Sequence, residues 1–315
     1  MKIAILEDYQ RAAPALACWA KLAAHDVDVV SEPLADEAQL AARLRDREAI
    51  VLIRERTRIT ASLLARLPGL RLVVQTAKVG AHVDLAACTA HGVTVCDGTG
   101  GPVAPAELAW ALILAASRKL VWEANRLRAG QWQGGVGQTL AGKRLGLVGY
   151  GRIARLLARY AAAFDMSVLV WGRESSLARA RADGLHTTAS MPEVFGCDVV
   201  SAMLRLNPET RGLIRYAHLA AMRADALFVN VSRAELVEPG ALERALGEGR
   251  PGHAALDVFM GEPLFGEVPA WLQQPNVTAT PHIGFVARDN YEQYFGDAFD
   301  AVNAFAAGAP VRVVA

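Results

Sequence analysis

The chain has 315 residues, of which 33 are Lys or Arg and 32 are Asp or Glu, so its net charge is only +1. This balance provides no basic surface for nucleic acid or for an anionic membrane. The hydrophobic share of 53% is too high for a disordered chain. The length predicts two domains with a large buried core.

Three features of the sequence favour a cytoplasmic protein. The longest clean apolar run, Leu108–Ala116, is well short of the roughly 20 residues that a membrane-spanning helix needs. The opening segment, Met1–Asp8, places two acids after one short apolar run, which is unlike a signal peptide. The four cysteines form no CxxC pair, so we expect reduced, buried thiols and no metal site.

Short apolar runs alternate with helical patterns along the first third of the chain. This alternation predicts an α/β fold in which helices cover both faces of a parallel sheet. The strands expected here are Lys2–Leu6, Val27–Val30, Ala49–Ile53, Arg71–Gln75 and Val93–Val95.

A glycine-rich loop at residues 97–102 then leads into a long apolar helix, expected over Pro105–Arg128. After a second glycine-rich break, at residues 134–137, six further apolar runs match a complete doubly wound nucleotide-binding sheet. The tail predicts one more helix, over Asp289–Ala307. The six expected strands are Arg144–Val148, Ser167–Trp171, Asp198–Met203, Ala226–Val231, His253–Asp257 and Val277–Thr280.

The strongest local motif is a G-x-G-x-x-A pattern that follows the first of these six runs. Gly149 permits the tight strand-to-helix turn, Gly151 lets the backbone approach a pyrophosphate, and the small Ala154 allows close packing of helix on strand. The free N–H groups of the first helical turn favour the anion. The residues expected to contact a dinucleotide here are Gly149, Tyr150, Gly151, Arg152 and Ile153.

The end of the next run bears on which dinucleotide binds. Gly172 stands where NAD sites usually place an acid for the ribose 2′-OH, and Arg173 follows it. An arginine with neighbouring hydroxyl groups such as that of Ser175 suits a 2′-phosphate, which favours NADP. Glu174 could take the acidic role after a shift of one or two residues, so NAD stays open.

Three more segments follow late strands, where open α/β sheets place their chemistry: Val229–Arg233, Ala255–Leu264 and Thr280–Gly284. With these segments and the Gly149 turn, the chain resembles the D-isomer-specific 2-hydroxyacid dehydrogenases over nearly its whole length. The resemblance implies two Rossmann-like doubly wound parallel-sheet domains with an active-site cleft between them. It also implies an NAD(P)-dependent oxidoreductase that interconverts a small 2-keto acid and the D-2-hydroxy acid by hydride transfer.

The resemblance assigns catalytic roles to three side chains. Arg233 matches the arginine that grips the carboxylate and keto oxygen of the substrate, a planar pair that suits a guanidinium fork. His282 matches the donor that protonates the keto oxygen, and Glu262 matches the acid that stabilises its imidazolium form. Each side chain alone has an ordinary structural explanation, and their joint occurrence at strand ends favours catalysis.

The resemblance extends the cofactor site beyond the phosphate turn. Asp257 matches an aspartate that contacts the nicotinamide carboxamide, although a strand-end acid bonded to backbone would give the same pattern. Leu204 matches a residue whose backbone lines the cofactor. The other residues expected there are Val231, Arg233, His282 and Gly284.

In the first domain, residues 76–84 occupy the place of the family's glycine-rich loop, whose amides bind the substrate carboxylate. Lys78, Val79 and Gly80 are therefore expected to contact the substrate, although Lys78 could equally face solvent. Ala77 and Val79 depart from the glycines usual there. Arg54 sits where relatives place an arginine near an anionic substrate end, and a solvated basic stretch is the alternative.

The resemblance implies a flavodoxin-like substrate-binding domain at residues 1–97, completed by residues 285–315, and an NAD(P)-binding Rossmann domain at residues 98–284. The helix over Pro105–Arg128 is too apolar for full solvation, and its family counterpart packs against a twin subunit, so we expect a homodimer. Two other functions stay open. They are a dinucleotide-gated, corepressor-like binding protein and a formate- or phosphite-type dehydrogenase on the same scaffold.

Overall fold

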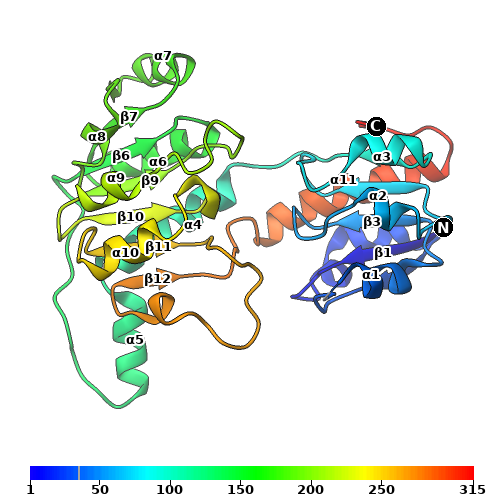
Figure 1. Cartoon of the computed structure of the whole chain (residues 1–315), viewed down its shortest axis with the longest axis horizontal. Coiled ribbons are helices and arrows are strands. Elements are labelled where there is room, and N and C mark those ends of the chain that lie inside the picture. Colours follow the sequence, from blue (N-terminus) through cyan, green and yellow to red (C-terminus); the bar gives the residue numbers. More distant parts are fainter. Residues whose placement is uncertain (35) are drawn as a thin grey trace. The chain divides into compact units, whose positions relative to one another are not determined.

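The computed structural model describes residues 1–34 and 36–315 and divides the chain into two compact units. Unit 1 comprises Met1–Gly101 and Val286–Ala315, and unit 2 comprises Pro102–Phe285. Both marked ends of the chain therefore belong to unit 1 (Figure 1). Within the ranges described, no helix combines the length and apolarity that crossing a membrane requires.

Unit 1 is built on five parallel strands in the order β2-β1-β3-β4-β5. Of its central strands, Ala49–Leu52 is apolar throughout and Leu72–Gln75 is apolar up to Gln75. All residues of both strands are buried, as expected where helices cover both sides of a parallel sheet. The strands are β1 (Lys2–Leu6), β2 (Asp26–Val29), β3 (Ala49–Leu52), β4 (Leu72–Gln75) and β5 (Thr94–Cys96).

Short helices follow most of these strands, and side-chain caps start three of them. Asp36, Thr60 and Asp84 each accept a hydrogen bond from a backbone N–H group in the first turn of the helix that follows. The helices are η1 (Ala13–Ala15), η2 (Ala17–Leu22), α1 (Glu37–Leu44), α2 (Ala61–Leu64), α3 (Leu85–Ala90) and α11 (Arg288–Ala306).

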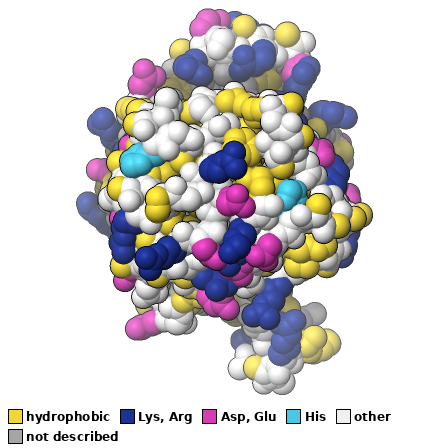
Figure 2. Space-filling view, turned by 90° about the vertical axis from the view of Figure 1, so that its right-hand side faces the viewer, with side chains coloured by type: hydrophobic (Ala, Val, Ile, Leu, Met, Phe, Trp, Pro, Cys, Tyr) yellow, Lys and Arg dark blue, Asp and Glu magenta, His cyan; other side chains and the backbone are white. Residues whose placement is uncertain are grey.

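The last thirty residues, Val286–Ala315, complete unit 1. Helix α11 packs against η2 and β4, and Glu292 on it accepts hydrogen bonds from the N–H groups of Ala17 and Cys18. The tail beyond α11 pairs with β5 in an antiparallel bridge between Cys96 and Val313. This pairing covers the outer edge of the sheet. Acidic and basic side chains are intermingled on the face of unit 1 that Figure 2 presents.

Unit 2 contains seven parallel strands in the order β12-β11-β10-β9-β6-β7-β8. The order reverses between β6 and β9, and ligands of such sheets bind at this switch point, beyond the carboxyl ends of the strands. The strands are β6 (Arg144–Val148), β7 (Ser167–Trp171), β8 (His186–Thr187), β9 (Val199–Ala202), β10 (Leu227–Asn230), β11 (His253–Leu256) and β12 (Val277–Ala279).

Two hydrophobic clusters, one on each face of this sheet, make up the core of unit 2. Helix α4 packs against α6 and the strands β10 and β11, whereas α5 projects away from the sheet (Figure 1). The helices are α4 (Val103–Ser117), α5 (Leu120–Arg128), α6 (Arg152–Ala163), α7 (Glu174–Ala182), α8 (Met191–Val194), α9 (Tyr216–Ala220), η3 (Ala234–Leu236), α10 (Ala241–Gly247) and η4 (Ala270–Gln273).

The α/β class with parallel sheets is confirmed, but two expectations for unit 2 are wrong. The sheet has a seventh strand, β8, whose two residues pair with β7 and are too few to form an apolar run. The helix expected over Pro105–Arg128 is two helices. Lys119 lies between them with a left-handed φ of 53°, which interrupts the helical path after α4.

Candidate functional site

The turn after β6 has the geometry of a phosphate-binding loop. Gly149 has a φ of 101°, and a Cβ atom there would lie 2.8 Å from the Met203 carbonyl oxygen. A Cβ atom at Gly151 would meet nothing within 4 Å, so the backbone at the start of α6 is accessible. No side chain caps this helix, which leaves its first N–H groups for an anion. A dinucleotide pyrophosphate therefore fits this turn.

The residues expected at the ribose lie at the end of β7, beside the phosphate turn. A Cβ atom at Gly172 would lie 3.7 Å from Gly149 Cα, so the two strand ends approach closely. Arg173 precedes α7, and its side chain is exposed. Glu174 forms an ion pair with Arg181 on the same helix (2.9 Å), and hydrogen bonding to Arg181 lowers the pKa of the Glu174 carboxyl.

The remaining cofactor candidates border the same edge of the sheet. Leu204 follows β9, and its Cδ2 atom would lie 2.9 Å from a Cβ atom at Gly149. Val231 follows β10 and is nearly buried. A Cβ atom at Gly284 would lie 3.0 Å from the Asp257 carboxylate, so a larger residue would require this carboxylate to shift.

Asp257, directly after β11, holds the loop that carries His282. Its side chain is 0% exposed. Asp257 Oδ1 accepts hydrogen bonds from Thr280 Oγ1 and from the Ile283 N–H group, and Oδ2 accepts one from the Gly284 N–H group, each at 2.7 Å. Burial raises the pKa of this carboxyl, and the three donors and nearby His282 partly oppose that shift. These are the contacts of a strand-end acid bonded to backbone; contact with a nicotinamide carboxamide stays a prediction.

His282 and Glu262 form an acid–base pair in unit 2. His282 Nδ1 lies 2.6 Å from Glu262 Oε2, and both side chains are about one quarter exposed. Glu262 Oε1 accepts a hydrogen bond from the Phe259 N–H group at 2.7 Å. The Phe285 ring meets the imidazole edge-on at 5.7 Å. This arrangement fixes Nδ1 against a carboxylate and leaves Nε2 as the ring nitrogen that can serve a ligand.

Arg233 lies in a loop that a buried asparagine shapes. Asn230, at the end of β10, accepts a hydrogen bond from the Ser232 N–H group and donates one to the Arg233 carbonyl oxygen. Ser232 Oγ donates to the carbonyl oxygen of Ala202, at the end of β9. Arg233 itself donates to the Ser232 carbonyl oxygen at 2.6 Å. Asn230 is a supporting residue that was not among the predicted site residues, although a polar residue closing an apolar run was the available signal.

The substrate-binding candidates belong to unit 1. Arg54 follows β3 with a left-handed φ of 58°, and its guanidinium lies 3.7 Å from the Glu55 carboxylate. Lys78 Nζ forms a 2.9 Å ion pair with Asp97, whose own side chain is nearly buried. Val79 and Gly80 are partly exposed. The Lys78 side chain is 69% exposed, so it faces solvent while it pairs with Asp97, and its contact with a substrate stays a prediction.

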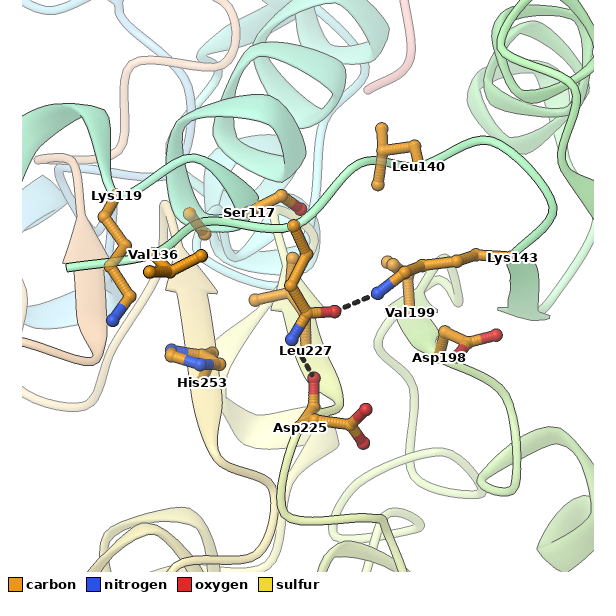
Figure 3. Close-up of a pocket in the computed structure, with 12 residues that line it drawn as sticks. Ser117, Lys119, Val136, Leu140, Lys143, Asp198, Val199, Asp225, Leu227 and His253 are labelled. Atoms are coloured by element: carbon orange, nitrogen blue, oxygen red, sulfur yellow. Dashed lines mark hydrogen bonds between the residues drawn. The ribbon is translucent and has the colours of Figure 1, made fainter.

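A cavity of about 70 Å³ lies at the opposite edge of the unit 2 sheet, beside the starts of β9, β10 and β11 (Figure 3). Lys143 donates a hydrogen bond to the Gln138 side-chain oxygen, and the Gln138 amide nitrogen donates one to the Asp225 carbonyl oxygen. Asp198 and Asp225 both pair with Arg223. Lys143, Asp198 and Asp225, which line this cavity, therefore have partners in the protein. The cavity lies at the amino ends of these strands, opposite the carboxyl ends where the candidate residues of unit 2 lie.

Comparisons with known proteins agree with this geometry. A family model described as the NAD-binding domain of D-isomer specific 2-hydroxyacid dehydrogenases matches residues 110–284. The glyoxylate reductase of Aeropyrum pernix is 33% identical over 279 residues, which cover 85% of this chain and 83% of that protein. A crystal structure of an oxidoreductase from Ralstonia solanacearum is 48% identical, with a TM-score of 0.97 over 100% of this chain and 96% of that one.

A further relative is longer than this chain. The D-3-phosphoglycerate dehydrogenase of Mycobacterium leprae is 34% identical over 276 residues, which cover 87% of this chain and 52% of that protein. The chain thus spans about half the length of this relative.

The hydrogen bonds of Asp257 predict the effect of Asp257→Asn. An asparagine keeps the shape of the side chain but turns one acceptor into an N–H donor that faces the donors of the loop. The free energy of unfolding should therefore fall by about 1–3 kcal/mol. Urea unfolding measures this loss. The exposed Asp289→Asn is the control, expected within about 0.5 kcal/mol of the parent. Equal stability of both variants would contradict the role assigned to Asp257.

Proposed function

The chain belongs to the D-isomer specific 2-hydroxyacid dehydrogenase family and is a nicotinamide-dinucleotide-dependent oxidoreductase, and on this premise we propose that it reduces a small 2-keto acid with His282 as the proton donor. The observation that carries the proposal is the 2.6 Å contact between His282 and Glu262. Glyoxylate, hydroxypyruvate and phenylpyruvate are suitable test substrates because each joins a ketone or aldehyde carbon to a carboxylate.

The proton moves from His282 Nε2 to the keto oxygen of the substrate. Glu262 accepts from Nδ1, so the negative carboxylate orients the ring and stabilises its protonated form. Because Glu262 is itself held by the Phe259 N–H group, the pair is oriented before substrate arrives. The nicotinamide, when bound, supplies the hydride that reduces the keto carbon of the substrate.

Arg233 binds the substrate in this proposal. Its guanidinium presents several N–H donors in one plane, which matches the coplanar carboxylate and keto oxygens of a 2-keto acid. The Asn230 hydrogen bonds fix the backbone from which this side chain extends. Arg54, Val79 and Gly80 are proposed contacts from unit 1, with Arg54 suited to an anionic group at the far end of the substrate. Lys78 is the fourth proposed substrate contact of unit 1, and its ion pair with Asp97 holds its ammonium group.

The cofactor is proposed to be NADP in preference to NAD. Gly172 offers no carboxylate for a ribose 2′-OH, whereas Arg173 and Ser175 at the start of α7 offer a cation and a hydroxyl for a 2′-phosphate. Glu174, the candidate acid for NAD, is held by Arg181. The ion pair between Glu174 and Arg181 therefore supports NADP as the cofactor, with Arg173 as the residue that binds its 2′-phosphate.

A homodimer formed through an arm of unit 2 is also proposed. The arm consists of α5 and the loop at residues 129–138, and all nine residues of α5 are at least partly exposed. The arm is ordered by its own contacts, since Glu123 accepts hydrogen bonds from the N–H groups of Gly134 and Gly135. It nevertheless exposes Trp132 (75%) and Val136 (89%). A rigid arm with exposed apolar side chains suits a partner surface.

A second copy of this chain provides such a surface. A groove of about 470 Å³ runs between α5 and residues 272–281, and Phe259 and Leu264 contribute apolar walls. In a two-fold dimer each copy contributes both the arm and the groove, so one set of contacts forms twice.

The four cysteines are buried as free thiols, which supports the proposed location in the reducing cytoplasm.

Replacing His282 tests the proposed chemistry. His282→Ala should lower kcat for 2-keto acid reduction by roughly 10²- to 10⁴-fold, because the positioned proton donor is lost. Glu262→Gln keeps a hydrogen-bond acceptor but removes the charge, and should lower kcat less. Steady-state rates of dinucleotide oxidation measure both, with the exposed His186→Ala as control. Unchanged turnover in His282→Ala, or parent activity on formate or phosphite alone, would refute the mechanism.

Replacing Arg173 tests the choice of cofactor. Arg173→Ala should weaken NADPH binding about tenfold and leave NADH binding nearly unchanged, because only NADPH carries the 2′-phosphate. Glu174→Gln is the matched variant, and it should affect neither dinucleotide. Fluorescence titration gives both dissociation constants. A parent enzyme that binds NADH at least tenfold tighter than NADPH, with a selective NADH loss in Glu174→Gln, would reverse the assignment.

Changing the arm tests the dimer. The parent should sediment at twice the chain mass of 33.6 kDa, and Trp132→Asp combined with Leu127→Asp should shift it toward that single-chain mass. Val311→Asp, at another exposed apolar side chain, should leave the mass unchanged. Analytical ultracentrifugation measures this. A parent that sediments as a monomer would disprove the assembly.

A further inference from the structure

Arg179 on α7 connects this helix to the phosphate turn after β6. Its Nη2 atom donates a hydrogen bond to the Tyr150 carbonyl oxygen and another to Ser176 Oγ, both at 3.1 Å. Tyr150 lies in the phosphate turn between Gly149 and Gly151, and Ser176 lies in the first turn of α7. One guanidinium therefore joins the turn after β6 to the first turn of α7.

A second connection joins the same elements at the other end of α7. The Tyr150 side chain is only 3% exposed, and its hydroxyl donates to the carboxylate of Asp183 at 2.8 Å. Asp183 is the residue at which α7 ends, and it also pairs with Arg155 on α6 at 2.5 Å. Hydrogen bonds to Arg155 and Tyr150 lower the pKa of the Asp183 carboxyl, which keeps this acceptor charged.

These two connections set the spacing between parts of one ligand. A dinucleotide bound in such a fold places its pyrophosphate on the turn after the first strand and its adenosine ribose at the end of the second. The ends of β6 and β7 lie close, since a Cβ atom at Gly172 would be 3.7 Å from Gly149 Cα. Arg179 lies beside this junction and donates hydrogen bonds to two protein acceptors, the Tyr150 carbonyl oxygen and Ser176 Oγ.

We propose that Arg179 is a positioning residue that locks the phosphate turn to α7 and so preorganises the site for the adenosine half of the dinucleotide. The proposal rests on the dinucleotide site proposed above. The bond to the Tyr150 carbonyl oxygen restrains the backbone whose neighbouring N–H groups would face the pyrophosphate. Binding to a site that is already ordered costs less conformational entropy, so the lock increases affinity without contacting the ligand.

This role differs from that of Arg173 in a measurable way. A side chain that binds the 2′-phosphate discriminates between NADPH and NADH, whereas a side chain that orders the phosphate turn acts on the features both share. Removing Arg179 should therefore raise both dissociation constants by the same factor, roughly 3- to 10-fold for the loss of one hydrogen bond that restrains the turn. At saturating cofactor kcat should remain near the parent value.

The experiment compares Arg179→Ala with Arg181→Ala, its matched control. Both are arginines on α7, but Arg181 pairs with the exposed Glu174 instead of the phosphate turn. Hydrogen exchange of the amides at residues 150–152 is measured first in cofactor-free protein. Arg179→Ala should accelerate it severalfold and Arg181→Ala should not, because only the first loses a restraint on the turn. Titrations with NADPH and NADH then give the dissociation constants.

A milder variant removes only the second connection. Tyr150→Phe keeps the buried ring but deletes its bond to Asp183, and should accelerate exchange less than Arg179→Ala. Unchanged exchange in Arg179→Ala would overturn the proposal, and so would a loss of affinity confined to NADPH, which would make Arg179 a phosphate ligand. If the parent binds neither dinucleotide, the proposed function fails, whereas the exchange data still decide whether Arg179 restrains the turn.

Discussion

The arrangement of the candidate site depends on one buried carboxylate. Asp257 is closed off from solvent, and three donors from the loop at residues 280–284 converge on its two oxygens. A buried charge without partners would be costly, so the loop and the carboxylate stabilise each other only in this conformation. His282 lies within the segment that these bonds enclose. Its left-handed backbone, at a φ of 52°, is an uncommon conformation for a non-glycine residue.

The same pattern recurs around the other two catalytic candidates. Glu262 uses one oxygen for the imidazole and the other for a backbone N–H group, and Asn230 uses both ends of its amide to hold the loop of Arg233. His282 and Arg233 are thus each supported by partly or fully buried polar groups: His282 by Asp257 and Glu262, which follow the neighbouring strand β11, and Arg233 by Asn230, at the end of its own strand β10. Such support keeps reacting groups in place before binding, which is where much of the catalytic advantage of an enzyme arises.

The sequence predicted those parts of the protein that depend on local pattern. Continuous apolar runs identified the central strands, because burial on both faces demands them, and glycine spacing identified the turn after β6. The sequence did not predict β8, because two residues are too few to form an apolar run. It also did not predict the end of α4, because the left-handed backbone of Lys119 leaves no pattern in the sequence. It could not find the ion pair of Lys78 with Asp97 or the bridge made by Arg179, because both join segments whose proximity depends on the fold.

The position of α11 has a consequence for how the chain folds as it is synthesised. Unit 2 is continuous from Pro102 to Phe285 and can acquire its contacts as soon as that stretch has left the ribosome. Unit 1 has no such opportunity, because η2 and β4 pack against a helix encoded almost two hundred residues after β5. Until α11 emerges, the nascent unit 1 presents an uncovered apolar surface, the kind that chaperones bind. The domain begun first is therefore the one completed last.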